Sequence, residues 1–163
     1  MTFARLLPLL ACALVLSACG GGSSPPATAA IPQTCGFPLV YANGGTSGYA
    51  VGTTAAVSVP KTITPCGITQ VQSVSLSLCV TPADVSELKV QLLNGSSSPT
   101  TVSLASATPS GSCLDRGTLY NLSLPTSNLG NVTNSWQLSV EDTRPGYTSS
   151  YFVGWSLEVK GLQ

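Results

Sequence analysis

Apolar and small polar residues alternate over short stretches along most of the chain beyond residue 50. The clearest stretches are Leu88–Leu92, Trp136–Val140 and Tyr151–Val159, in which every second side chain is apolar. A period of two places those side chains on one face of a β-strand. Shorter stretches of the same kind occur at 55–59, 74–80, 102–104 and 122–124. The sequence lacks the three-to-four spacing of an amphipathic helix, so the pattern predicts strands and argues against a parallel α/β fold.

Turn-forming residues separate the alternating stretches. They include Asn94-Gly95, Pro109-Ser110-Gly111, the segment 128–131 and Pro145-Gly146. Short strands that each have one apolar face and are joined by frequent turns are typical of antiparallel sheets packed against each other. The sequence therefore predicts an all-β fold, an antiparallel β-sandwich, formed by a single domain over residues 34–163.

The first 18 residues have the order of an export signal. Arg5 precedes the apolar run Leu6–Leu16, which is only about half the ~20 residues that a membrane-spanning helix needs. The string Leu16-Ser17-Ala18-Cys19 resembles a bacterial lipobox, which implies cleavage before Cys19 and attachment of lipid, including palmitate, at its thiol. The alternative is ordinary signal cleavage, with Cys19 as an incidental thiol.

Residues 19–33 are mostly Gly, Ser, Pro and Ala, with few apolar side chains to bury. This composition predicts a flexible tether between the lipid and the domain. Gly20, not Asp, follows Cys19. By resemblance to Gram-negative lipoproteins, this implies that the exported protein is held at the outer membrane, so the membrane is one expected partner.

Four cysteines remain in the predicted mature chain besides the lipidated one, at Cys35, Cys66, Cys79 and Cys113. An even number in an exported chain predicts two disulfides. Cys79 lies on the opposite face of its strand from Leu76 and Leu78, so it can hold the Cys113 loop against the outside of the sheet. The expected pairs are therefore Cys35–Cys66 and Cys79–Cys113. A zinc site is the alternative, but the spacing contains no Cys-x-x-Cys pair and the chain has no His.

The composition argues against several function classes. Charged residues make up 7% of the chain, against about 25% in an ordinary domain, and the formal net charge is zero. With six Lys and Arg residues in all, a basic nucleic-acid-binding surface is not expected. The chain has no His, which excludes Ser-His-Asp and Cys-His catalysis.

The C-terminal part of the chain resembles the P domain, also called the Homo B domain. The residues that carry this resemblance are Trp136–Asp142, a Gly-containing turn and Gly154–Val159. Upstream, 68–78 and 88–95 resemble the early strands of the same family, with Glu87 where the family usually has Asp. The resemblance covers roughly residues 55–161.

The P domain follows the protease domain in proprotein convertases and in many bacterial secreted proteases. The resemblance implies a jelly-roll β-sandwich whose closing hairpin carries Trp136 and Trp155. We expect these two side chains to fill the core from adjacent strands. The residues after Cys19 are too few to add a subtilisin-like catalytic domain, so an accessory module and no enzyme is expected.

Paired carboxylates are the remaining catalytic class in a chain without His. The acidic residues are Asp84, Glu87, Asp115, Glu141, Asp142 and Glu158. Glu141 and Asp142 are neighbours on a predicted strand, so their side chains face opposite sides and cannot act together. Asp84 and Glu87 flank a turn and are expected as solvated charges, and no catalytic residue is assigned.

Calcium is the one cofactor for which the sequence offers a candidate. Some P domains bind calcium, and Asp142 matches the family's Asp at the end of the first Trp strand. The turn after Asp142 lacks a further acidic residue, so we expect Asp142 to cap its own turn and assign no metal.

Two function classes remain. The first is a lipid-anchored, non-catalytic module with a binding, scaffolding or stabilising role toward an envelope or secreted protein. Arg144–Tyr147 and Tyr151 are its candidate patch for a sugar or peptide, the alternative being a plain loop. The second class is a small hydrolase built from Ser, Asp and Glu residues that the sequence does not identify. Acids converging in one pocket would favour the hydrolase, and acids scattered around the rims would favour the module.

Overall fold

The computed structural model of the chain describes residues 29–45, 47–51, 55–81, 85–95, 97–105, 107–127, 129, 131–144 and 150–163. The expected signal (1–18), Cys19 and most of the expected tether (19–33) lie outside these residues. The last two residues of that stretch belong to the first strand, which begins at Pro32. No helix within the described ranges is long and apolar enough to cross a membrane.

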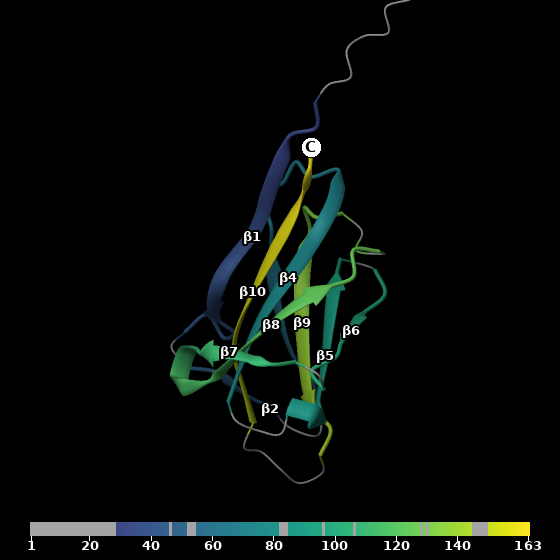
Figure 1. The fold of residues 1–163 in the computed structure, drawn as a ribbon. Helices are drawn as coiled ribbons and strands as arrows, with labels where there is room; N and C mark the ends of the chain where they lie inside the picture. Colours follow the sequence, from purple (N-terminus) through teal and green to yellow (C-terminus); the bar gives the residue numbers. More distant parts are fainter. Residues whose placement is uncertain are drawn as a thin grey trace, which may run out of the picture.

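Strands are the predominant secondary structure of the described residues, which contain no α-helix (Figure 1). They are β1 (Pro32–Tyr41), β2 (Tyr49–Val51), β3 (Val57–Thr62), β4 (Gln70–Val80), β5 (Leu88–Asn94), β6 (Thr100–Val102), β7 (Pro109–Ser112), β8 (Thr118–Leu124), β9 (Ser135–Asp142) and β10 (Ser150–Leu162). Two single-turn 3-10 helices, η1 (Val85–Glu87) and η2 (Leu114–Arg116), lie between them.

The strands form two antiparallel sheets, which confirms the all-β sandwich. Sheet A has the order β1-β10-β4-β8-β7, with β2 also paired to β10, and sheet B has the order β3-β9-β5-β6. The steps from β3 to β4, β4 to β5, β8 to β9 and β9 to β10 each cross from one sheet to the other. This connectivity is that of a jelly roll. Sheet A is the nearer layer in Figure 1.

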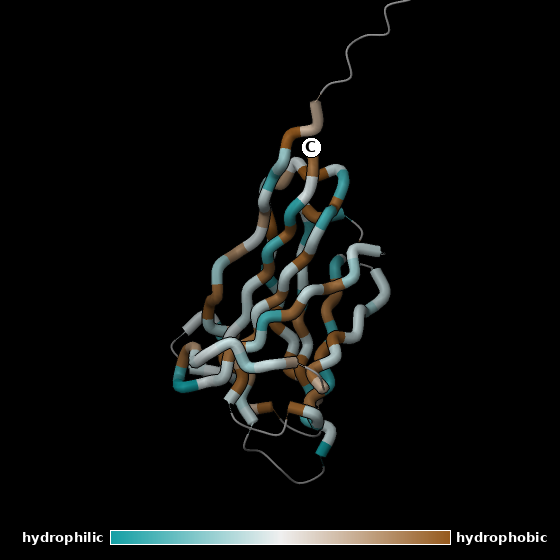
Figure 2. Tube along the Cα trace, viewed as in Figure 1, coloured by the Kyte–Doolittle hydropathy of each residue, from teal (hydrophilic) through white to brown (hydrophobic). Residues whose placement is uncertain are grey.

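Alternation of apolar and polar side chains positions both sheets against a common core. Figure 2 shows brown and pale positions following one another along the strands. In β4 and β5 every side chain that the pattern predicts to face inward is buried, namely Val74, Leu76, Leu78, Val80, Leu88, Val90 and Leu92. The apolar faces of the two sheets therefore meet in one buried layer.

Trp136 and Trp155 both lie in this core, as expected, and each is 0% exposed. The indole N–H of Trp136 donates to the carbonyl of Val132 at 3.0 Å. The ring of Trp155 meets the ring of Phe37 edge-on, with centroids 4.7 Å apart.

The expectation that the two tryptophans lie on adjacent strands is wrong. β9 belongs to sheet B and β10 to sheet A, so they form no closing hairpin. The period of two in each strand identifies the buried face but carries no information about which strands pair. In a jelly roll, consecutive strands usually pack in opposite sheets, so the two indoles enter the core from opposite sides.

β10 departs from simple alternation near its beginning. Phe152 pairs with Val80 whereas Gly154 pairs with Cys79, so Val153 is an extra residue, a β-bulge. The bulge shifts the parity by one position. The expectation that Tyr151 shares the inward face of Trp155 is therefore wrong, and Phe152 occupies the core instead, 0% exposed, while Tyr151 is 43% exposed.

Both expected disulfides are formed. Cys35 of β1 is bonded to Cys66 in the segment before β4, and Cys79 of β4 is bonded to Cys113 just before η2. Cys79 points away from the core, as expected, yet it is fully buried because the Cys113 turn covers it. The bonded residues are 31 and 34 positions apart, and each bond contributes roughly 3–4 kcal/mol in the chain-entropy description.

The Asn94-Gly95 turn is also present, and it has a role that the sequence does not suggest. Asn94 is buried, and its side-chain amide donates to the carbonyls of Leu129 and Asn131. Gly95 has a φ of +55°, and a Cβ there would lie 2.1 Å from the Asn134 amide. This turn therefore anchors the loop before β9.

Removing either indole should cost much of the stability of the domain. We expect Trp136→Ala and Trp155→Ala each to lower the free energy of unfolding by about 3–5 kcal/mol, because each leaves a large cavity. A domain of this kind has about 5–15 kcal/mol in total. Denaturant titration followed by circular dichroism measures the change.

Ser135→Ala and Glu158→Ala are the matched controls, since both side chains are exposed on the same two strands. Each should change the free energy of unfolding by less than about 0.5 kcal/mol. Unchanged midpoints in both Trp variants would contradict the core positions.

Candidate functional site

Two tyrosines lie near the acidic turn η2 at one end of the sandwich. Tyr41, at the end of β1, contacts Asp115 of this turn, and Tyr151, at the beginning of β10, lies near it. Tyr151 is 43% exposed, and Tyr49, at the beginning of β2, is 42% exposed. A hollow of about 330 Å³ opens here, lined by Ser47, Gly48, Thr81, Asp115, Tyr151 and Val153. We call this hollow the rim site.

The backbone of η2 is held in an uncommon conformation. Asp115 and Arg116 have φ values of +48° and +59°, in the left-handed region that few residues other than glycine adopt. The Cys113 N–H donates to the Gly117 carbonyl at 2.9 Å, and the Gly117 N–H donates to the Leu114 carbonyl at 2.8 Å. Together with the disulfide to Cys79, these bonds offset the cost of the turn, and they fix Asp115 at the rim.

Gly117 is what allows the turn to lie so close to the sheet. A Cβ at this position would be 2.8 Å from Cys79 Sγ and 3.0 Å from the Leu114 carbonyl oxygen. Any larger residue would push the turn away from β4. The sequence Cys113 to Gly117 therefore folds locally around its own disulfide.

Asp115 accepts a hydrogen bond from a tyrosine, not from a basic side chain. The Tyr41 hydroxyl donates to Asp115 Oδ1 at 3.2 Å. Partial burial of the phenol, together with the negative charge and hydrogen bond of Asp115, raises the pKa of Tyr41 above its usual value of 10.0. The phenol is therefore protonated at neutral pH and acts as the donor.

The other acidic side chains of the described residues are engaged elsewhere. Glu87 pairs with Arg144 at 2.6 Å, Glu141 with Lys89 at 3.4 Å and Glu158 with Lys160 at 2.9 Å. No group of three or more His, Cys, Asp or Glu side chains that could hold a metal ion occurs in the part of the chain that the structure describes. Asp84 lies outside that part.

Asp142, the calcium candidate, caps its own turn. It is 1% exposed, its Oδ1 accepts the Arg144 N–H at 2.9 Å, and its Oδ2 accepts the Ser150 hydroxyl at 2.9 Å. Oδ1 thus caps the turn after β9, and Oδ2 joins the end of β9 to the beginning of β10. The described residues around Asp142 do not assemble a calcium site, and the turn residues 145–149 lie outside the described part.

Of the patch expected from Arg144–Tyr147 and Tyr151, the structure describes only the first and last residues, Arg144 and Tyr151. Arg144 is paired with Glu87, and Tyr151 lines the rim site with Asp115. The structure therefore places Tyr151 in the same hollow as Asp115, an acidic residue to which the sequence analysis gives no role. Residues 74 positions apart meet in the Tyr41–Asp115 bond, and no local pattern predicts such a contact.

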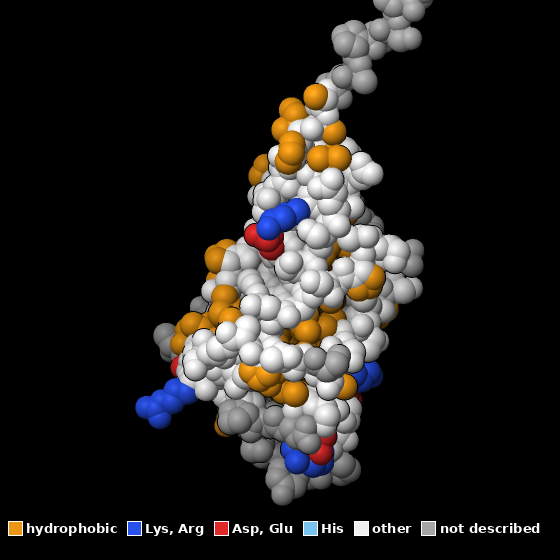
Figure 3. Space-filling model, in the orientation of Figure 1, with side chains coloured by type: hydrophobic (Ala, Val, Ile, Leu, Met, Phe, Trp, Pro, Cys, Tyr) orange, Lys and Arg blue, Asp and Glu red, His pale blue; other side chains and the backbone are white. Residues whose placement is uncertain are grey.

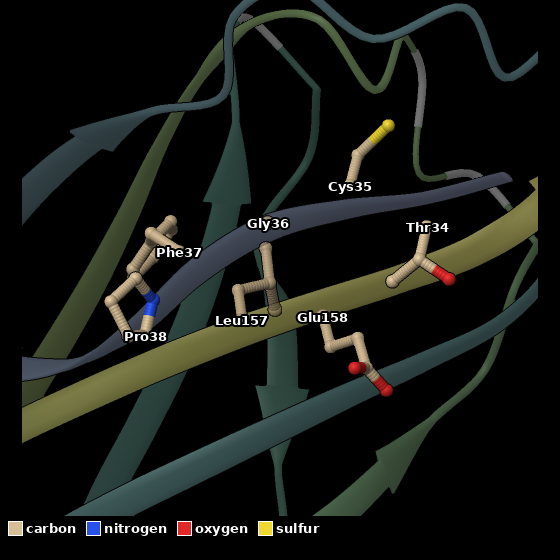
Figure 4. Close-up of a pocket in the computed structure, with 7 residues that line it drawn as sticks. All are labelled: Thr34, Cys35, Gly36, Phe37, Pro38, Leu157 and Glu158. Carbon is tan, nitrogen blue, oxygen red and sulfur yellow. The ribbon is translucent and has the colours of Figure 1, made fainter.

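A second hollow lies on the outer face of sheet A, where the pairing of β1 with β10 shifts between Phe37 and Val40. It has a volume of about 340 Å³ and is lined by Thr34, Cys35, Gly36, Phe37, Pro38, Leu157 and Glu158 (Figure 4). An adjoining hollow extends over Ser75, Ser77, Asn121 and Ser156. Figure 3 shows this face as largely uncharged, and its carboxylate, Glu158, is paired with Lys160. The one described carboxylate of this face is thus engaged, and the Ser77 hydroxyl donates to Asn121 Oδ1 at 2.8 Å, so the rim site is the stronger candidate.

Comparison with known proteins gives a likeness of fold. No protein family matches the chain, and no curated protein matches it. Among solved structures, the serine protease of Aeromonas sobria matches with a TM-score of 0.50 and 14% identity, over 80% of this chain and 28% of the protease chain. The same protease in complex with a chaperone matches with a TM-score of 0.50 and 14% identity, over 82% of this chain and 28% of that one. At this identity the match shows the fold alone, and the chain spans little more than a quarter of the protease's length.

The Tyr41–Asp115 bond predicts a linked titration. Removing the charge with Asp115→Asn should lower the pKa of Tyr41, because the neutral amide no longer disfavours the phenolate. The pair stabilises the folded state below pH 10 and loses that contribution as the pH rises through the raised pKa of Tyr41. Spectrophotometric titration of the tyrosines, with Tyr41→Phe to assign the signal, measures the shift. An unchanged pKa in Asp115→Asn would contradict the contact.

Proposed function

We propose that this chain is a non-catalytic accessory β-domain of a protease system, similar to a P domain and tethered to the outer membrane by a lipid on Cys19. The observation that carries the proposal is the likeness of fold to a part of the Aeromonas sobria serine protease. The resemblance to the P domain of the strands that carry Trp136 and Trp155 supports the same proposal. The likeness covers most of this chain and a minor part of the protease chain. Such coverage is expected if the matched part of the protease is a module separate from its catalytic domain.

The chemistry of the described side chains supports binding rather than catalysis. The chain has no His, and its acidic side chains are distributed among separate ion pairs, a turn cap and the rim. Among the described serines, Ser150 donates its hydroxyl to Asp142, but both residues are buried, so this pair is not open to a substrate as an activated nucleophile. The rim site, with the exposed Tyr151 beside Asp115, offers instead a surface of the kind that proteins use for contact.

A protein partner also fits the second comparison, in which the protease is bound to a chaperone. We propose that this domain contacts a serine protease of the same envelope, or a protein that accompanies it. Residues 19–31, which precede β1, give the domain reach from a membrane anchor to such a partner.

Capture from the producing cells tests the partner class. The lipid-anchored chain is crosslinked in intact cells and purified, and the bound proteins are treated with a fluorescent fluorophosphonate, which labels active serine hydrolases. We expect a labelled protein to accompany the native chain and to be absent from a control in which residues 1–31 carry an unrelated domain. Absence of any labelled partner, or labelling of the chain itself, would contradict the proposal.

Metabolic labelling tests the anchor. An alkynyl palmitate analogue should label the native chain and fail to label Cys19→Ser, because that variant lacks the acceptor thiol. The variant should also leave the membrane fraction, since the acyl chains supply the binding energy at about 0.8 kcal/mol per buried CH₂. Equal labelling of the two chains would show that Cys19 is not the lipid site.

A further inference from the structure

Asp115 stands apart from the other acidic side chains that the structure describes. Glu87, Glu141 and Glu158 each have a basic partner within 3.4 Å, and Asp142 is buried in its turn. Asp115 is exposed, and its described polar contact is the Tyr41 hydroxyl at Oδ1. Its second oxygen, Oδ2, therefore has no donor among the described residues and remains available to a ligand.

The surroundings of Asp115 suit a cation with an apolar stem. The rim site combines the carboxylate with the Tyr151 ring, the Val153 side chain and the Thr81 and Ser47 side chains. An ammonium or guanidinium group forms its strongest hydrogen bonds with a carboxylate, and it is attracted to the face of an aromatic ring within about 6 Å. The methylenes of a Lys or Arg side chain can lie along the exposed Tyr151 side chain at the same time.

The site is also fixed in advance. The disulfide between Cys79 and Cys113, the backbone bonds of η2 and the Tyr41 hydroxyl hold Asp115 in place. The backbone at Tyr151 is held against the end of β4, because its N–H donates to Thr81 Oγ1 at 2.9 Å and its carbonyl accepts the Thr81 N–H at 3.0 Å. A ligand that binds such a site orders few groups, so less affinity is lost to entropy.

We propose that the rim site binds a lysine or arginine side chain of a polypeptide partner, with Asp115 as its counter-ion and Tyr151 as its aromatic wall. As an account of how the domain meets its partner, this inference rests on the proposed function. Binding of the basic side chain itself is a property of the isolated chain and is measured without any protease. Failure of one proposal is therefore distinguishable from failure of the other.

Titration of the exported, disulfide-bonded chain in detergent, followed by NMR, tests the inference. The probes are N-acetyl-lysine methylamide, the arginine equivalent, and the uncharged norleucine equivalent, which has nearly the same stem. We expect the basic probes to shift the signals of Gly48, Thr81, Asp115 and Tyr151 at millimolar concentration and the norleucine probe to leave them unchanged. Moderate salt should weaken the binding, because the charges are exposed.

Two variants separate the site from a general attraction to acids. Asp115→Asn keeps the side-chain shape and tolerates the left-handed backbone, and it should weaken binding of the basic probes by at least about tenfold. Glu158→Gln removes a surface acid from the outer face of sheet A and should leave binding unchanged. Thermal unfolding of both variants confirms that they are folded.

Other outcomes would overturn the inference. Equal binding of the norleucine probe would make the hollow an apolar site. If Asp115→Asn kept its affinity for the basic probes, Asp115 would not be the counter-ion of the bound side chain. A shift of the same signals by maltose, insensitive to Asp115→Asn, together with no effect of the basic probes, would make it a sugar site.

Discussion

The apolar layer between the two sheets is the feature on which the rest of the molecule depends. Charged residues make up only 7% of the chain, and the three ion pairs of the described residues are all partly exposed. Such pairs contribute at most about 1 kcal/mol each. Fully buried Trp136, Trp155 and Phe152 each remove a large apolar side chain from water, at about 25 cal/mol per Å². Burial of apolar side chains between the sheets is therefore the main stabilisation of the fold, and the two disulfides add to it.

The bulge at Val153 links this layer to the rim site. By adding one residue to β10, it lets Phe152 and Trp155 face the core together and turns Tyr151 outward. The outward Tyr151 and Asp115, whose backbone is left-handed, line the same hollow. The rim site thus lies where a strand leaves its regular pairing, as is common for bulges near functional surfaces. The same strand supplies a core position and a contact position within five residues.

The sequence predicts the parts of this structure that depend on local pattern. The alternation at 74–80 and 88–92 gives the buried faces, the outward parity of Cys79 gives its bond to Cys113, and Asp142 caps its turn as expected. Strand pairing is not local, so the placement of Trp136 and Trp155 in opposite sheets was missed. The bulge at Val153 changes which side chains of β10 face inward, and the alternation in the sequence of this strand does not indicate it. The Tyr41–Asp115 contact joins residues far apart in the chain, and the one clue to it was Cys113, two positions before Asp115.

The apolar layer stabilises the fold, whereas the Cys79–Cys113 bond fixes the position of the rim site. The double variant Cys79→Ala/Cys113→Ala separates these roles. Its unfolding, followed together with the titration of Tyr41, is the most direct test. The account predicts cooperative unfolding with a free energy lowered by roughly 3–4 kcal/mol, and a Tyr41 pKa that falls toward its usual value because Asp115 is released. A chain that no longer unfolds cooperatively, or a Tyr41 pKa that stays as high as in the native protein, would contradict it.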